Sequence, residues 1–177
     1  PRNIIDKFPF ATDANATDIA DLSITKSDTA GQSSSESGYT SGGQTRIPPA
    51  PAFATNVIDK FPFAADANAT DVGDLTQARQ AMAGQSSTGN GYTSGGTLGD
   101  FPPTSYNIID KFPFASDANA TDVGDLPEAR AWAAGQSSAT HGYVSGRTAN
   151  NATEYIDKFS FSTDGNATDV GDLSNGR

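Results

Sequence analysis

The stretch IDKFPFATDANATDIADL, residues 5–22, decides the fold because the chain repeats it. Near-copies begin at Ile58, Ile109 and Ile156, and the starts are 53, 51 and 47 residues apart. A period near 50 residues is typical of propellers and solenoids rather than of short helical repeats. Fold and function must therefore be interpreted from one repeat unit.

A second motif lies between the copies. AGQSS begins at Ala30, Ala83 and Ala134, and leads after three further residues into GYTSGG or GYVSGR. The distance from the Asp of IDKF to the Gly of GY is 32 residues in every complete copy. All variation in length falls in the connectors after this block, as expected for surface loops that join paired elements. We predict one repeat array over residues 1–177, with units at about 1–43, 44–96, 97–147 and 148–177, the last one incomplete.

Each unit carries the signals of four short strands. Ile4, Asp6 and Phe8 fall on one face of the IDKF segment, and aromatic and β-branched residues favour a pleated surface. Pro9 lacks an amide donor, so this strand should end, bulge or lie at an edge there. The GDL, AGQSS and GY segments supply three further strands separated by turn-rich sequence. The prediction is an all-β fold of four-stranded antiparallel blades, as in a β-propeller.

Two alternatives follow from composition and local pattern. A net charge of -10 with few large apolar residues is typical of disordered chains. The fixed 32-residue spacing argues against disorder, because an unpacked chain has little physical reason to retain it. The second alternative is a helix over PEARAWAA from Pro127, which only partly follows helical apolar spacing.

The units resemble the kelch repeat. From Arg130, the chain reads R-AWAAGQSSATH-GYVSG, a variable loop, then YIDKFSF and NATDVGDL, and Tyr39 is followed by the double glycine Gly42 and Gly43. The resemblance implies a kelch-like β-propeller or a segment of one. The Trp that this family has in its closing strand is replaced by Thr at positions 17, 70, 121 and 168, and Lys26 stands where Arg is expected. The IDKFPFASDANATDVGDL copies are also similar to repeat arrays predicted in marine phages, which implies a virion or extracellular location.

The densest polar chemistry is the Asp-rich segment of each copy. The spacing D-x-N-x-T-D-x-x-D-L resembles the calcium loop of FG-GAP propeller repeats, and closely spaced oxygen ligands suit Ca²⁺. The alternative is that Asp and Asn cap turns through their own backbone. No other cofactor is expected. The candidate calcium ligands are Asp13, Asn15, Asp21, Asp66, Asn68, Asp74, Asp117, Asn119, Asp125, Asp164, Asn166 and Asp172.

The sequence offers little for catalysis. The chain has no cysteine, and its one histidine, His141, stands at a turn position that is Ser37 and Asn90 in the other units. A Ser/His or Cys nucleophile system therefore cannot be repeated along the array. The carboxylate pair Asp71 and Asp74 has near-copies in every unit, which is typical of a structural role. We expect a protein that is not an enzyme.

The connectors are the candidate recognition elements, because they alone differ between units. They carry Phe53, Phe101 and Tyr106, and loops on a rigid scaffold commonly carry recognition. The negative charge disfavours nucleic acid, and no apolar run is long enough for membrane insertion. We predict a binding or adhesion module of a phage virion, of tail-fibre type, or of an extracellular appendage, with a surface glycan or protein as partner. The alternative is a purely structural component that assembles with itself or with other virion or fibre subunits.

Overall fold

The computed structural model describes residues 2–45, 52–99, 104–147 and 153–176, and all regular secondary structure within them is β-strand. The IDKF segments form β1 (Arg2–Lys7), β7 (Val57–Pro62), β11 (Ile108–Pro113) and β15 (Tyr155–Ser160). The GDL segments form β2 (Thr17–Lys26), β8 (Thr70–Asp74), β12 (Thr121–Asp125) and β16 (Thr168–Asp172). The AGQSS segments form β3 (Ala30–Ser33), β9 (Ala83–Ser86) and β13 (Ala134–Ser137), and the GY segments form β4 (Ser37–Ser41), β10 (Asn90–Ser94) and β14 (His141–Ser145). The first connector adds the short pair β5 (Gln44–Thr45) and β6 (Phe53–Ala54).

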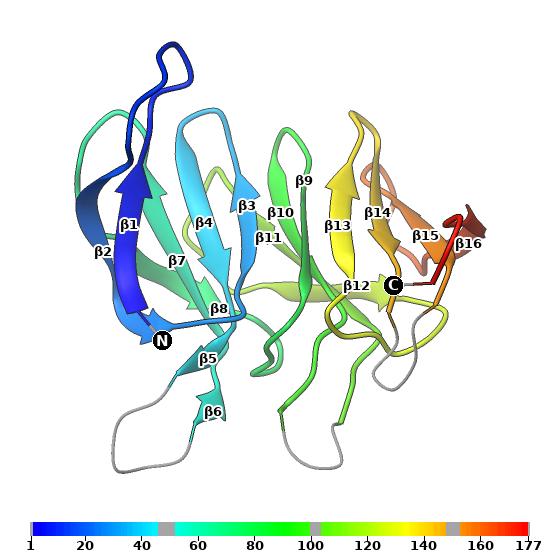
Figure 1. Cartoon of the computed structure of the whole chain (residues 1–177). Coiled ribbons are helices and arrows are strands. Elements are labelled where there is room, and N and C mark those ends of the chain that lie inside the picture. The colour runs from blue at the N-terminus through cyan, green and yellow to red at the C-terminus, as the bar shows by residue number, and fades with distance from the viewer. Residues whose placement is uncertain (1, 46–51, 100–103, 148–152, 177) are drawn as a thin grey trace.

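The strands form three four-stranded antiparallel sheets and two two-stranded ones. The large sheets have the orders β3-β4-β7-β8, β9-β10-β11-β12 and β13-β14-β15-β16, and the small ones pair β1 with β2 and β5 with β6. The predicted all-β class is confirmed, and no helix is present in the described ranges. Each large sheet joins the AGQSS and GY strands of one predicted unit to the IDKF and GDL strands of the next. Figure 1 shows the sheets following one another from β1–β2 to β13–β16 in an open series, and the described strands do not close into a ring.

Proline and a β-bulge shape the IDKF strands. Pro62 and Pro113 are the last residues of β7 and β11, as their missing amide donor predicts. The pairing of β7 with β8 shifts register between Ile58 and Asp59, and β11 and β15 repeat the shift. Such a bulge re-aims the side chains that follow it. Here it precedes an Asp that is fully buried in all three large sheets.

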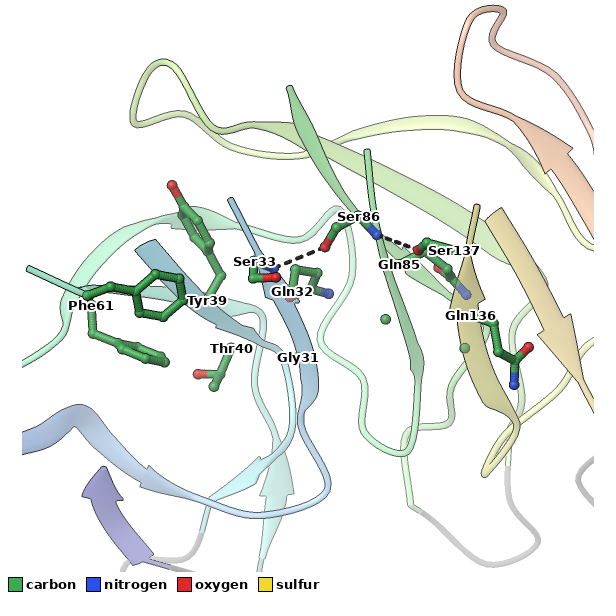
Figure 2. Close-up of a pocket in the computed structure, with 14 residues that line it drawn as sticks. Gly31, Gln32, Ser33, Tyr39, Thr40, Phe61, Gln85, Ser86, Gln136 and Ser137 are labelled. Atoms are coloured by element: carbon green, nitrogen blue, oxygen red, sulfur yellow. Dashed lines mark hydrogen bonds between the residues drawn. The ribbon is translucent and has the colours of Figure 1, made fainter. Parts of the chain in front are cut away.

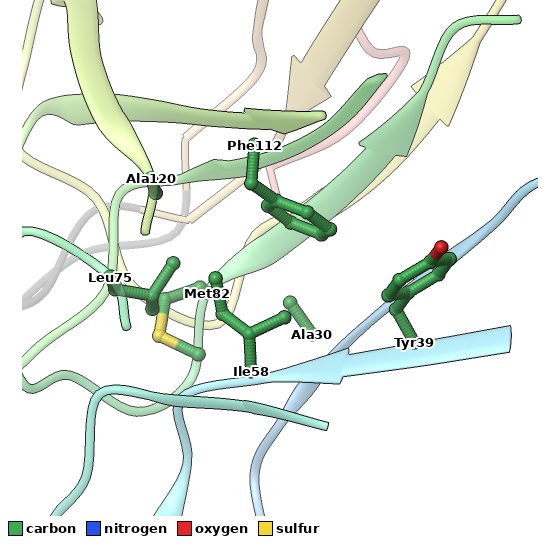
Figure 3. Packing of buried hydrophobic residues seen from close by; sticks show 7 residues of the cluster. All are labelled: Ala30, Tyr39, Ile58, Leu75, Met82, Phe112 and Ala120. Atoms are coloured by element: carbon green, nitrogen blue, oxygen red, sulfur yellow. The ribbon is translucent and has the colours of Figure 1, made fainter. Parts of the chain in front are cut away.

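The apolar core lies between consecutive sheets. Figure 3 shows one such layer, in which residues of β3, β4 and β7 meet residues of the next sheet. Its members are Ala30, Tyr39, Ile58, Leu75, Met82, Phe112 and Ala120. A second layer repeats this arrangement between the last two sheets. Because each sheet buries its faces only against its neighbours, stability should be a sum of nearest-neighbour terms, as in repeat proteins generally. None of the described residues form a helix long and apolar enough to cross a membrane.

Candidate functional site

The three AGQSS strands lie side by side and form the floor of a broad, open hollow. Strands β3, β9 and β13 contribute their Gly, Gln and Ser residues to it, and its volume is about 560 Å³. Figure 2 shows Tyr39 and Phe61 at one end of the hollow and Gln136 and Ser137 at the other. The floor is therefore a polar strip of small residues with aromatic rings at one end.

Glycine in AGQSS is explained by the close approach of these strands. A Cβ atom on Gly84 would overlap the carbonyl oxygen of Gly31, and one on Gly135 would overlap the carbonyl oxygen of Gly84. A Cβ atom on Gly31 would meet nothing within 4 Å. The glycine is thus needed wherever an AGQSS strand has a preceding neighbour.

Glutamine in AGQSS ties adjacent sheets together. The Gln32 Nε2 atom lies 2.9 Å from Ser41 Oγ in its own sheet, and 3.0 Å from the Tyr92 carbonyl in the next sheet. Gln85 repeats the second contact at 3.1 Å, with the carbonyl of Tyr143. In the last sheet, Gln136 is exposed and donates to Ser145 of its own sheet at 3.1 Å.

The first serine of AGQSS also forms hydrogen bonds between adjacent sheets. The Ser33 amide donates to Ser86 Oγ at 3.0 Å, and the Ser86 amide donates to Ser137 Oγ at 2.9 Å (Figure 2). Where another sheet follows, the Gln of the motif and the backbone amide of its first Ser therefore both bond to that sheet. The exposed residues of this floor are Gly31, Ser33, Gly135, Gln136 and Ser137.

The aromatic residues interlock between sheets in the same direction. Tyr39 stacks on Phe114 with ring centroids 4.8 Å apart and lies 5.6 Å from Phe112. Tyr92 repeats these contacts with Phe161 and Phe159, at 4.8 Å and 5.4 Å. Aromatic pairs at these distances add to the stability gained by burial alone. These rings are core residues of the seam between sheets.

The IDKF aspartate of each large sheet forms a buried ion pair with a basic residue that precedes the sheet. Lys26 Nζ is 2.9 Å from Asp59, Arg79 Nη2 is 2.6 Å from Asp110, and Arg130 Nη2 is 2.7 Å from Asp157. The Asp is the repeated one of IDKF, and the basic residue lies four positions before AGQSS. Both side chains of every pair are almost completely removed from solvent.

Burial shifts the pKa values within these pairs. Desolvation lowers the pKa of Lys26 and of Arg79, although the partner carboxylate opposes the shift in each case. Asp110 also accepts hydrogen bonds from the Thr76 amide and hydroxyl, at 3.1 Å and 2.7 Å. The third copy has Pro127 at the position of Thr76, which offers neither donor. There, desolvation raises the pKa of Asp157 despite Arg130.

The Asp-rich segments lie along the outer part of each seam. Asp66, Asp117 and Asp164 pair with the IDKF lysine of the preceding sheet, at 2.8, 3.0 and 2.5 Å. The side-chain oxygens of Asn68, Asn119 and Asn166 each accept the amide of an Asp in the preceding sheet at 3.0 Å. These side-chain oxygens therefore already accept hydrogen bonds from lysine side chains and from backbone amides.

The calcium hypothesis stays a prediction. Among the described residues, no three His, Cys, Asp or Glu side chains are grouped as a metal site would need. Asp13 and Asn15, which precede the first sheet's GDL strand, are exposed. A calorimetric titration with CaCl₂ tests the hypothesis directly, and a thermal melt in chelator that is unchanged from buffer would remove it.

The three candidate recognition residues of the connectors differ in their structural setting. Phe53 lies in β6 and is 50% exposed. Tyr106 is partly buried, and its backbone bonds to Gly96 and to Arg130 at 2.9 Å and 3.0 Å. Phe101 lies outside the described residues. The recognition role of these three residues stays a prediction.

Some contacts of the seams were not predicted from sequence. The pairing of Lys26, Arg79 and Arg130 with the IDKF aspartates was missed, although their constant distance from AGQSS is a visible signal. His141, expected in a turn, is the half-buried first residue of β14. Asp28, Ala81 and Trp132 have φ values of 54° to 58°, and Ala81 and Trp132 each donate their amide to the preceding member of this set. Asp is enriched in the left-handed backbone region, but the residue types Ala and Trp do not predict it.

No protein-family model matches the chain, and no curated protein matches it significantly. The resemblances to kelch repeats and to marine phage arrays therefore rest on the sequence motifs alone.

Proposed function

We propose that the chain is a non-catalytic binding module, built as a segment of a kelch-like β-propeller, that recognises a surface glycan or protein through its connectors. The observation that carries this proposal is that the repeated side chains hold the sheets together, whereas the connectors differ between units. Repeated side chains, such as Gln32, Gln85 and the buried aspartates, are engaged in contacts between and within sheets. The connectors, whose sequences differ between units, are therefore the segments that we assign to recognition.

The position of the connectors supports this proposal. The connectors join β4 to β7, β10 to β11 and β14 to β15, which are equivalent strand pairs of the three large sheets. They therefore emerge at the equivalent end of each sheet, between its two central strands, and can contribute to one composite surface. Phe53 offers that surface a half-exposed aromatic ring, a type of side chain common at binding hot spots. The acidic charge of -10 supports a soluble, externally displayed module of a virion or an extracellular appendage.

The test is a comparison of two phenylalanines of equal exposure. Phe53 and Phe63 are 50% and 49% exposed, but Phe63 follows an IDKF strand and lies away from the connectors. The labelled chain is applied to a glycan array and to immobilised surface proteins of candidate host cells. We expect Phe53→Ala to weaken the binding and Phe63→Ala to leave it unchanged. Equal binding by both variants, or no binding by the parent chain, would count against the proposal.

The second candidate function is structural self-assembly, and the last sheet favours it. Ala134 and Gln136 are exposed there, although the equivalent Ala83 and Gln85 are buried beneath the following sheet. The last sheet thus displays the groups that bind another sheet inside the array. Sedimentation velocity over a concentration series tests this function. Association that Gln136→Lys abolishes would support a structural component, whereas a monomer at all concentrations would refute it.

A further inference from the structure

An apolar groove lies between β1 and the first large sheet. It has a volume of about 270 Å³ and runs along the edge of β1 toward the end of β7. Its apolar lining includes Ile5, Phe8, Phe10, Ile19, Phe61 and Phe63. Phe8, Phe10 and Phe63 are 58%, 96% and 49% exposed. We propose that this groove binds a further β-hairpin with the pattern basic-x3-AGQSS-x3-GYxSG, in addition to the three such hairpins of the described residues.

The free edge of β1 is the first argument. Strands β7, β11 and β15 each lie between a GDL strand and a GY strand, whereas β1 pairs with β2 and with no other described strand. An unpaired edge is a template for an added strand. In the large sheets the GY strand pairs in a constant register, with Tyr39 opposite Lys60 and Tyr92 opposite Lys111. The same register would place the tyrosine of the bound hairpin opposite Lys7.

The second argument is that no GY glycine packs on the ring of Phe8 among the described residues. In the large sheets, the equivalent ring lies directly over the glycine of GY, so that a Cβ atom on Gly91 would overlap the ring of Phe112. Phe112 is 1% exposed and Phe159 is 4% exposed, against 58% for Phe8. The glycine of the hairpin would cover Phe8 in the same manner.

The third argument concerns the rings of the neighbouring sheet. Phe112 and Phe114 receive Tyr39 from the sheet before them. The equivalent Phe61 and Phe63 contact each other edge to face at 6.2 Å and line the groove. The tyrosine of a hairpin bound beside β1 would lie where it can stack on this pair.

Charge supplies the fourth argument. The IDKF aspartate is fully buried in each large sheet and is paired with the basic residue four positions before AGQSS. The equivalent Asp6 lines the groove and is exposed. A hairpin with Lys or Arg at that position would complete the pair. This requirement distinguishes the hairpin from an arbitrary apolar strand.

The partner cannot readily be a second copy of the described chain. Its three AGQSS–GY hairpins already pair with β7, β11 and β15 through their GY strands. A copy could offer one of them only by opening a sheet. The occupant is therefore a further hairpin of this pattern whose GY strand is not already paired with an IDKF strand.

The test uses the 177-residue chain and a labelled peptide of residues 79–96, RQAMAGQSSTGNGYTSGG. We expect saturable binding by fluorescence anisotropy. Binding should weaken about tenfold or more when the peptide carries Gly91→Val, or when the chain carries Asp6→Asn. Val170→Ala in the chain, which shortens a 46% exposed side chain of β16, is the control and should leave peptide binding unchanged. Since isolated hairpins are marginally stable, a cyclised form of the peptide is tested in parallel.

Register-specific cross-linking provides a second readout, because the natural chain has no cysteine. Asn90 pairs with Pro113, which is equivalent to Pro9. Peptide Asn90→Cys should form a disulfide with chain Pro9→Cys and not with chain Asp13→Cys. The proposal is overturned if neither peptide form binds, or if both cysteine variants react equally. It is also overturned if two copies of the chain cross-link through Pro9→Cys and His141→Cys, because a second copy would then be the occupant.

Discussion

The IDKF segment of the first sheet and that of the second large sheet have nearly the same sequence but different surroundings. In β11, Phe112 and Asp110 are buried at 1% and 0% exposure, whereas Phe8 of β1 is 58% exposed and Asp6 is also exposed. The difference comes from what lies next to each strand, since β11 has a GY strand on its other edge and β1 has none among the described strands. Burial in this array thus depends on the strands beside the motif and not on the motif alone. Equal substitutions in the two places should therefore have unequal costs.

The largest difference is expected at the buried aspartate. Asp110→Ala removes the partner of Arg79, whose side chain is 0% exposed and cannot regain water without opening the sheet. Stranding one member of a buried ion pair costs about 3–5 kcal/mol of unfolding free energy. Asp6→Ala is the matched control and should cost less than about 0.5 kcal/mol, as exposed substitutions generally do. Urea denaturation followed by circular dichroism measures both, and equal losses would contradict the comparison.

A smaller difference is expected at the glycine of AGQSS. Gly84→Ala forces a methyl group into the backbone of β3, so the two strands must separate. Overpacking of this kind costs about 1–3 kcal/mol. Gly31→Ala places its methyl group in open space and serves as the control. The thermal midpoint should fall for the first variant only, and a comparable fall for both would show that the glycine serves local backbone flexibility.

Local pattern was sufficient to predict the strands but not their assembly into sheets. The alternation in IDKF, the turn residues before GDL and the prolines at strand ends predicted the strands and their antiparallel class, which the structure confirms. The contacts across the seams were not predictable in the same way. They join residues that are far apart in sequence, such as Gln32 with Tyr92 and Lys60 with Asp117. No local propensity encodes such pairs.

The Asp-rich segments show why the candidate site was harder to predict than the fold. Their spacing is compatible both with a cation loop and with turn capping, because both uses need oxygen acceptors at short intervals. The structure adds a third use, in which Asn68 and Asp66 bind the neighbouring sheet. That use depends on which lysine and which amide face the segment. These neighbours are determined by how the sheets stack, and the sequence of one unit does not show them.

The asparagine of this segment offers the next comparison. Asn119→Ala removes the acceptor of the Asp74 amide, a hydrogen bond of 3.0 Å. The net loss of such a bond is about 1 kcal/mol. Asn15→Ala, in the exposed segment of the first sheet, is the control and should leave stability unchanged. Amide hydrogen exchange at Asp74 provides a local readout, and unchanged protection there in Asn119→Ala would refute the role assigned to this side chain.

The smallest effect is a difference in pH dependence between the first buried pair and the others. Burial lowers the pKa of Lys26 below its ordinary value of 10.5, so between these two values the unfolded chain binds more protons than the folded one. Stability must then rise with pH within that window, and this contribution is lost again as pH falls through the pKa of the folded state. Lys26→Arg replaces the lysine by the residue found in the other two pairs, and a guanidinium group stays charged throughout the window.

The measurement is the unfolding free energy of both proteins from pH 7 to pH 10.5, the upper limit being the ordinary lysine value. The natural chain should gain stability relative to Lys26→Arg as pH rises, because all other titrating groups are common to both proteins. Lys60 has a raised pKa through its hydrogen bond to Asp117, so it titrates above this window in the folded state and cancels in the difference. A difference that stays constant with pH would mean that Asp59 offsets the desolvation of Lys26 completely. The first pair would then be electrostatically equivalent to the Arg79 and Arg130 pairs despite its different cation.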